Sequence, residues 1–300
     1  MSLLINWLES LSIDTKITNR CTRHSSPKSS CLLCVSHCHS QSLSVEDNKV
    51  VVDVKKCNSC GDCTVVCPVG AVEGNLPKRN IINGMFAYSS EYCPSAKELL
   101  IYRKKGVKAI YLPANCLDER WNQAITEANV LLEQLGIEPY MINQDTNPED
   151  RSLSRRELFL SVRKKGQSLA KELTPASWRM GADTWSLPAN FPDTQFYQVA
   201  LDTEKCTICQ ACFNLCPQKV FTVTDTELMI DHQKCSNCSL CSDICPEKAV
   251  TISEKTAERS STLYSLVAGK CVRCKSSFYS FEASEQCHIC ANKPSDWLMP

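Results

Sequence analysis

This 300-residue sequence has no net charge and no long apolar segment. Its 33 basic residues balance its 33 acidic residues, so no global positive field indicates a nucleic-acid binder. Charged residues or proline interrupt the apolar runs before any reaches the length of a membrane span. Residues 1–13 have no basic start and no small-residue cleavage site, which argues against a secretory signal. We therefore expect a soluble, cytoplasmic protein.

The usual signatures of substrate chemistry are also missing. The sequence contains no G-x-G-x-x-G motif, no P-loop, no Ser/His/Asp arrangement and no flavin or molybdopterin signature. We therefore expect a chain without catalytic activity of its own, working as a subunit of a larger oxidoreductase.

Cysteine is abundant, with 22 residues, of which 20 fall into five motifs. Three motifs share the spacing C-x2-C-x2-C-x3-C-Pro, which is that of a 4Fe-4S ferredoxin. Disulfides would need an oxidising compartment, and structural zinc sites use C-x2-C pairs held further apart. An Asp-x-x-Lys lead-in precedes each motif, and we interpret Asp53, Asp202 and Asp231 as turn residues. The three motifs are Cys57/Cys60/Cys63/Cys67, Cys206/Cys209/Cys212/Cys216 and Cys235/Cys238/Cys241/Cys245.

Residues 197–254 contain two of these motifs and resemble the pseudo-twofold bacterial ferredoxin. In two-cluster ferredoxins the last cysteine of each motif ligates the other cluster. The resemblance therefore implies two crossed ligand sets. One is Cys206, Cys209, Cys212 and Cys245, and the other is Cys235, Cys238, Cys241 and Cys216.

The Cys57 motif has a candidate partner upstream, Cys21-x9-Cys31-x2-Cys34-x3-Cys38. This stretch resembles the first half of ferredoxin-like subunits of bacterial redox operons, with an insertion after its first cysteine. The resemblance implies a two-cluster domain over residues 18–78. His39 replaces the usual proline, and His24, His37 or His39 is an alternative ligand to Cys21; a vestigial site is a further alternative. The implied sets are Cys21, Cys31, Cys34 and Cys67, and Cys57, Cys60, Cys63 and Cys38.

The C-terminal cysteines have another spacing, Cys271-x2-Cys274-x12-Cys287-x2-Cys290. Residues 268–293 resemble a zinc ribbon, in which two knuckles hold one tetrahedral ion. Rubredoxin-type iron has the same four-thiolate geometry, and a small iron-sulfur site is a further option. Lys275 and Ala291 stand where rubredoxin knuckles usually carry proline and glycine, so we favour structural zinc.

Residues 80–145 alternate between strand and helix patterns. We expect strands at 85–89, 107–113 and 140–143 and helices at 95–105 and 118–135, which together form a small parallel α/β domain. Cys93 and Cys116 each follow a strand, at the edge where such sheets place ligands.

The segment resembles the delta-type iron-sulfur subunit of methanogen hydrogenase and heterodisulfide reductase complexes, which carries more cysteines for a two-iron cluster. We therefore expect this chain to keep the fold without that cluster, and Cys93 and Cys116 to be ordinary buried thiols rather than a redox-active pair.

Residues 146–196 are expected to form a linker with one basic helix. The region of Trp178, Trp185, Phe191 and Pro192 is expected to pack on the second ferredoxin domain rather than to bind a cofactor. The predicted fold class is therefore α+β. It comprises two two-cluster ferredoxin-like domains (18–78 and 197–254), a small α/β domain between them (80–145) and a C-terminal zinc ribbon (268–293).

We interpret the chain as an electron-transfer protein that relays electrons through about four 4Fe-4S clusters to or from a catalytic oxidoreductase. Family resemblance favours a partner of the formate dehydrogenase, hydrogenase or heterodisulfide-reductase type, with no role for nucleic acid or membrane. Two alternatives stay open. One is a dithiol redox enzyme that uses Cys93 and Cys116, and the other is a cluster-containing scaffold or sensor.

Overall fold

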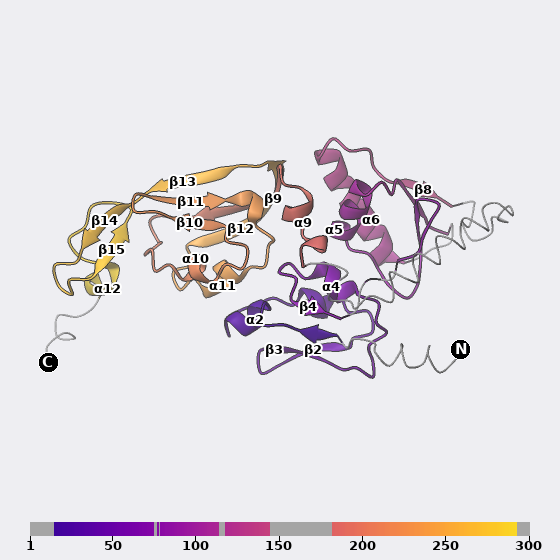
Figure 1. Cartoon of the computed structure of the whole chain (residues 1–300), viewed down its shortest axis with the longest axis horizontal. Helices are drawn as coiled ribbons and strands as arrows, with labels where there is room; N and C mark the ends of the chain where they lie inside the picture. Colours follow the sequence, from indigo (N-terminus) through magenta and orange to yellow (C-terminus); the bar gives the residue numbers. More distant parts are fainter. Residues whose placement is uncertain (1–14, 75–76, 78, 114–117, 145–181, 293–300) are drawn as a thin grey trace. The chain divides into compact units, whose positions relative to one another are not determined.

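The computed structural model describes residues 15–74, 77, 79–113, 118–144 and 182–292 (Figure 1). The chain divides into two compact units, the first made of Met1–His24 and Leu32–Asn190 and the second of Ser25–Cys31 and Phe191–Pro300. The basic helix expected within 146–196 lies outside the described residues, and so does Cys116.

The second unit is built from a repeated element of strand, cysteine loop, short helix and strand. The two copies interlock, because β9 pairs antiparallel with β12 and β10 pairs antiparallel with β11. Helices α10 and α11 contact each other on one side of these strands (Figure 1). The first copy comprises β9 (Thr194–Leu201), α10 (Ala211–Leu215) and β10 (Phe221–Val223). The second comprises β11 (Glu227–Asp231), the 3-10 turn η2 (His232–Lys234), α11 (Leu240–Ile244) and β12 (Val250–Glu258).

The hydrophobic core of this unit includes several motif cysteines. Val199 and Leu201 alternate with less buried residues along β9, as expected for a strand with one buried face. They pack with Leu228 and Ile230 of β11, both fully buried. Cys212, Cys235 and Cys241 belong to the same cluster of buried side chains. The cysteine loops are therefore held by the core and do not project from it.

The C-terminal part extends this unit with three further strands and a short helix. β13 (Ser261–Ser265) adds to the free edge of β11. β14 (Val267–Lys270) and β15 (Ser277–Ser280) form a separate antiparallel pair, followed by the short helix α12 (His288–Ala291).

The first part of the first unit repeats the strand order of the second unit. β1 pairs antiparallel with β4, and β2 pairs with β3 in a hairpin. The hairpin turn has positive φ at both Asp47 and Asn48, as a two-residue type I′ turn requires. The elements are β1 (Lys16–Ile17), α2 (Thr22–Ser25), α3 (Leu33–Ser36), β2 (Leu43–Glu46), β3 (Lys49–Val52), α4 (Asp62–Val66) and β4 (Val72–Glu73).

The rest of the first unit is a four-stranded sheet in the order β5-β6-β7-β8. β6, β7 and β8 are parallel, and β5, which the sequence did not predict, is antiparallel to β6. All the strands and helices expected over 80–145 are confirmed, each slightly shorter than predicted. They are β5 (Ile81–Ile82), β6 (Met85–Ala87), α5 (Ala96–Lys104), β7 (Ala109–Tyr111), α6 (Glu119–Gln134) and β8 (Met141–Asn143).

Trp121 organises the packing of this sheet and its helices. It is fully buried on α6, and its ring lies 5.7 Å from that of Phe86 on β6. Its Nε1 donates hydrogen bonds to the carbonyl oxygens of Tyr92 (3.0 Å) and Ser89 (3.2 Å). Because the indole both fills the core and satisfies two backbone acceptors, it ties the loop after β6 to the helix.

Of the aromatic residues expected to pack on the second ferredoxin domain, Trp178 lies outside the described residues, and Trp185 and Phe191 behave differently. Phe191 does pack there, with its ring 5.3 Å from that of Phe196. The prediction for Trp185 is wrong, because its ring lies 5.8 Å from Tyr102 of α5 in the first unit, with Lys105 Nζ above it. Trp185 ends η1 (Ala182–Trp185), which precedes α9 (Leu187–Asn190).

Candidate functional site

The three C-x2-C-x2-C loops have one backbone conformation. In each, the residue before the second cysteine and the residue after it have positive φ, a conformation that L-residues adopt only in special turns. Because these positive-φ residues alternate with the cysteines, the chain forms the tight loop that a cubane cluster needs. The pairs are Ser59 and Gly61 (φ 58° and 79°), Ile208 and Gln210 (49° and 64°), and Asn237 and Ser239 (56° and 58°).

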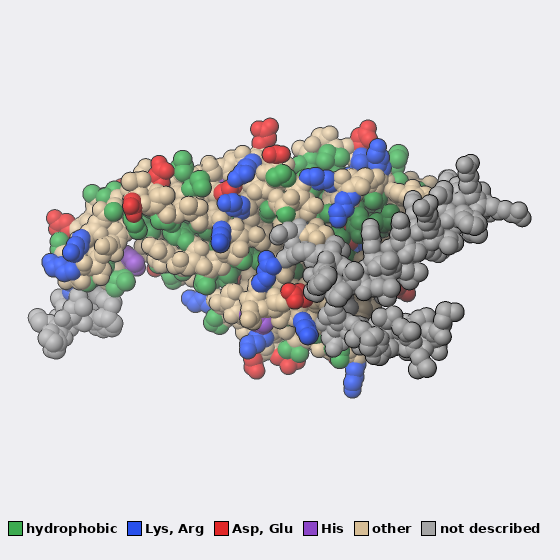
Figure 2. Space-filling model, viewed as in Figure 1, with side chains coloured by type: hydrophobic (Ala, Val, Ile, Leu, Met, Phe, Trp, Pro, Cys, Tyr) green, Lys and Arg blue, Asp and Glu red, His purple; other side chains and the backbone are tan. Residues whose placement is uncertain are grey.

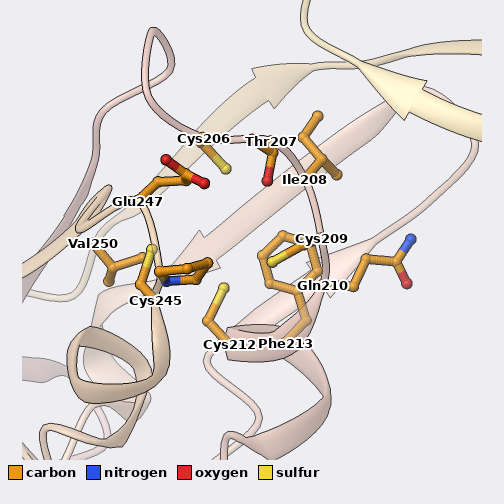
Figure 3. A pocket seen from close by; sticks show the side chains of 11 residues that line it. Cys206, Thr207, Ile208, Cys209, Gln210, Cys212, Phe213, Cys245, Glu247 and Val250 are labelled. Carbon is orange, nitrogen blue, oxygen red and sulfur yellow. The ribbon is translucent and has the colours of Figure 1, made fainter. Parts of the chain in front are cut away.

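Strand pairing brings a fourth cysteine to the loop that follows β9. The N–H of Asp202 donates to the carbonyl of Ala249 (2.8 Å), which joins the start of this loop to the turn after Cys245. The resulting pocket is lined by all four thiols of one implied set. Figure 3 shows their side chains directed toward a common space. They are Cys206, Cys209, Cys212 and Cys245.

The second pocket forms in the same way, with the roles of the two motifs exchanged. The N–H of Asp231 donates to the carbonyl of Val220 (2.9 Å), so the turn after Cys216 lies against the start of the next loop. Besides its cysteines, this pocket has a largely apolar lining, including Val199, Leu240 and Ile252. Its cysteines are Cys216, Cys235, Cys238 and Cys241.

The electrostatics of these pockets oppose free thiolates. The pKa of Cys212 is raised to about 12, first by burial and then by the charges of Cys206, Cys209 and Cys245. Burial and the charges of Cys238, Cys235 and Cys216 likewise raise the pKa of Cys241. Four thiolates can share such a space only with a positively charged group among them. The donor set and the pocket therefore fit a bound iron-sulfur cluster.

In the first unit, the Cys57 motif acquires Cys38 in the same way. The N–H of Asp53 donates to the carbonyl of Ser42 (2.8 Å), which places the turn after Cys38 against the start of this loop. The pKa of Cys63 is raised to about 12 by burial and then by the charges of Cys60, Cys34, Cys38 and Cys57. The structure thus brings Cys38 to Cys57, Cys60 and Cys63, and Cys34 also lies near them.

The remaining implied set is assembled only in part. The N–H of Thr18 donates to the carbonyl of Ala71 (2.8 Å). This hydrogen bond corresponds to the one that joins the loop after β9 to the turn after Cys245. Buried Cys21 follows this joint in the chain, as Cys206 follows the equivalent joint in the second unit. Cys31 differs, because it ends Ser25–Cys31, the segment that belongs to the second unit.

The Cys31-x2-Cys34 segment also has a different backbone from the other loops. Leu32 has φ −128°, where those loops have a positive φ before the helix, and α3 begins at Leu33. Ser30, next to Cys31, donates its N–H to Asp243 Oδ2 (2.7 Å) of α11, within the second unit.

The last cysteine of all four motifs starts the same turn. Its Sγ accepts a hydrogen bond from the backbone N–H four residues later, and the residue three positions later has positive φ. His39 in place of proline does not prevent this turn at Cys38. The donors are Ser42 to Cys38 (3.3 Å), Ala71 to Cys67 (3.2 Å), Val220 to Cys216 (3.5 Å) and Ala249 to Cys245 (3.2 Å).

The Asp-x-x-Lys lead-ins are turns closed by ion pairs. The lysine of each pairs with its own aspartate, at 3.5 Å for Lys56, 2.6 Å for Lys205 and 3.5 Å for Lys234. Asp53 and Asp202 also accept backbone N–H bonds two residues later, an Asx-turn pattern. The interpretation of these aspartates as turn residues is confirmed at both positions. Asp231 makes no such bond and instead pairs with Arg259 (2.8 Å).

A buried ion network beside the Cys57 motif is absent from the sequence predictions. Arg79 bonds Asp62 of α4 (2.7 Å) and both carboxylate oxygens of Glu98 on α5 (2.5 and 2.9 Å). Its Nη1 donates to the carbonyl of Cys60 (3.1 Å), and its guanidinium lies 4.4 Å from the ring centroid of Tyr92. The network links the cysteine loop to the α/β sheet. The charged residue within the motif, Asp62, was the one signal of it in the sequence.

Cys93 lies where the parallel sheet would place a ligand, but its environment is that of a structural thiol. Burial raises its pKa to about 12, and its Sγ contacts the carbonyl of Pro94 (3.6 Å). Because the thiolate is the reactive form, a raised pKa disfavours redox or nucleophilic chemistry at this position.

The C-terminal cysteines converge on one point. The Sγ atoms of the four residues all lie within 4.8 Å of one another, and three of the residues are buried. The pKa of Cys271 is lowered to about 6 by backbone hydrogen bonds from Cys274 and Cys287. Lys275 has φ 61°, which closes the first knuckle. This group, Cys271, Cys274, Cys287 and Cys290, could bind a metal ion.

The surface offers little further indication of a ligand. Basic and acidic side chains are interspersed over the face shown in Figure 2. Among the described residues, no helix is long and apolar enough to cross a membrane.

Two segments match known families. Residues 49–72 match the family model of a 4Fe-4S binding domain, and residues 198–246 match that of a 4Fe-4S dicluster domain. A comparison with curated proteins finds no match. The second segment contains all eight cysteines of the two pockets, and the first contains the complete Cys57 motif. These matches support iron-sulfur clusters in both units and an electron-transfer role for the protein.

Proposed function

We propose that this chain is an electron-relay protein that holds about four 4Fe-4S clusters and exchanges electrons with a catalytic oxidoreductase subunit. The observation that carries the proposal is the convergence of four thiols on each of two pockets in the second unit. A 4Fe-4S cluster supplies one-electron redox chemistry when bound. The proposed ligands are the sixteen cysteines of the four crossed sets.

The two sets of the second unit differ in the exposure of their cysteines. Apolar side chains such as Val199 and Ile252 line the pocket of Cys235, which is buried. In the other pocket, Cys209 is exposed. We propose that this exposed edge is a place where a protein partner can exchange electrons. The ligand role of Cys21 is supported by the Thr18–Ala71 hydrogen bond, which joins the chain before Cys21 to the turn after Cys67. That of Cys31 rests on the sequence resemblance alone.

The partner type rests on the resemblance to subunits of redox complexes. We propose a formate dehydrogenase, hydrogenase or heterodisulfide-reductase-like partner. The abundance of thiols is the reason to expect a reducing compartment such as the cytoplasm. The alternative of a dithiol enzyme is disfavoured by the raised pKa of Cys93. In the other alternative, a scaffold or sensor, the clusters would not pass electrons to a catalytic partner.

For the C-terminal site we propose structural zinc, in agreement with its four thiolates and closed coordination. Iron at this position would give a rubredoxin-like ferric absorption. Metal analysis of the full chain separates the two, because a zinc site adds about one zinc and no visible absorption.

Anaerobic purification tests the proposed function. We expect brown protein with about sixteen irons and as many sulfides, following the stoichiometry of four clusters. It should accept electrons from a strong reductant and pass them to viologen dyes, but should not oxidise formate, hydrogen or NADH alone. If the isolated chain turned over a substrate, and Cys93→Ser abolished that turnover with all clusters intact, the protein would be a dithiol enzyme instead.

A further inference from the structure

Cys38 differs from the three other closing cysteines in the groups around its sulfur. All four accept a backbone N–H, but only in the Cys38 turn do the residues two and four positions later carry hydroxyls. Ser42 Oγ lies 3.2 Å from Cys38 Sγ, and Ser40 Oγ lies 3.6 Å from it. The equivalent pairs in the other turns are Val69 and Ala71, Gln218 and Val220, and Glu247 and Ala249.

The two hydroxyls form a chain that ends on the sulfur. Ser40 Oγ donates to Ser42 Oγ (3.2 Å), and Ser42 is buried, with 4% of its surface exposed. A metal-bound thiolate has no proton and can only accept, so Ser42 must donate its hydroxyl proton to Cys38 Sγ. A donor that itself accepts a hydrogen bond is polarised and donates more strongly. Cys38 Sγ thus receives both the N–H and the O–H of Ser42.

We propose that Ser42, supported by Ser40, raises the reduction potential of the cluster that Cys38 helps to hold. The inference rests on the proposed function, since it requires a cluster on Cys57, Cys60, Cys63 and Cys38. One-electron reduction adds a negative charge that the sulfur ligands share, and hydrogen-bond donors to those ligands stabilise the reduced form. Of the four closing turns, only that of Cys38 has a hydroxyl at both positions, so we assign this control to that site.

The test uses the full-length protein, purified anaerobically with its clusters, and a redox titration followed by low-temperature electron paramagnetic resonance. Cys38→Ala first identifies the spectral component of this site, because that component should weaken or disappear. Ser42→Ala should then move the midpoint of that component to lower potential and leave the other midpoints in place. Ser42→Thr, which keeps the hydroxyl, should restore the wild-type midpoint. Ser44→Ala is the matched control, because the Ser44 hydroxyl bonds only exposed Glu46 (3.4 Å).

The outcomes separate this inference from the proposed function. A Ser42→Ala protein with wild-type iron content and an unmoved midpoint would overturn the role of the hydroxyl while leaving the relay intact. Equal shifts in Ser42→Ala and Ser42→Thr would assign the effect to packing, and would also overturn it. If Cys38→Ala changed no component and no iron content, Cys38 would not be a ligand, and both this inference and the crossed set of the first unit would fall. Should Ser42→Ala lose the cluster, Ser40→Ala tests the same chain, with a smaller downward shift expected.

Discussion

Replacing Arg79 should destabilise the first unit far more than replacing any surface arginine. Its side chain and those of Asp62 and Glu98 are only 1–2% exposed, so solvent cannot screen the charges that remain. Removing one partner of a buried ion network leaves uncompensated charge and costs about 3–5 kcal/mol. For Arg79→Met we expect a loss of this size in the free energy of unfolding. At roughly 2–4 °C per kcal/mol for a domain of this size, the melting temperature should fall by about 6–20 °C.

The assay is anaerobic thermal unfolding of the cluster-loaded protein at one fixed scan rate. Arg103→Met is the control, because the Arg103 side chain is also largely buried (9% exposed) but its partner at 3.7 Å, Glu138, is 92% exposed. Its removal leaves a carboxylate that solvent screens, so loss of this ion pair costs little. The double variant Arg79→Met/Glu98→Gln should regain part of the stability, since it removes one of the two stranded carboxylates. If Arg79→Met and Arg103→Met had the same melting temperature, the reasoning would be refuted.

The loss of stability in Arg79→Met should also depend on pH. Burial raises the pKa of Glu98 above its usual value, and Arg79 opposes that shift. Without Arg79 the pKa of Glu98 in the folded state rises further. The free energy of unfolding then falls as the pH increases from the pKa of Glu98 in the unfolded chain, about 4.3, toward its pKa in the folded state. Arg79→Met should therefore lie closer to wild type at pH 6 than at pH 8. A deficit that grew at the lower pH would contradict this account.

Three further predictions follow. Cys216→Ala should remove the electron paramagnetic resonance signal of the site at Cys235 and spare that at Cys206; loss of only the latter would contradict the crossed pairing. Cys274→Ser should release about one metal ion per chain without changing the cluster spectra, and a fully retained ion would argue against a four-thiolate site. Trp121→Phe keeps an aromatic ring but strands two backbone carbonyls, so it should cost about 1–3 kcal/mol in thermal unfolding; an unchanged melting temperature would show that these bonds are dispensable.

Local features of the chain were predictable because they depend on short stretches of sequence. The C-x2-C-x2-C spacing and its lead-in aspartate specify a tight loop, and Asp53 and Asp202 close it through bonds to residues only two positions away. The helix of Trp121 was predictable for the same reason, since its apolar residues recur on one face. β5 was missed because two residues carry no periodicity.

Long-range features needed the tertiary structure. In the sequence, the crossed grouping of the cysteines rested on family resemblance, and strand pairing supplies its physical reason. Because β9 pairs with β12 and β10 with β11, each closing turn lies against the other motif's loop. The turn at Cys38 forms without proline because its neighbours supply the same hydrogen bonds.

Arg79 carries no motif, and its role appears only where α4 and α5 bring two buried carboxylates to it. The sequence by itself therefore determined the chemistry of the ligands, which is a property of residue type and short spacing. The tertiary structure decided which ligands meet and which charges and hydroxyls surround them, because these contacts join residues far apart in the chain.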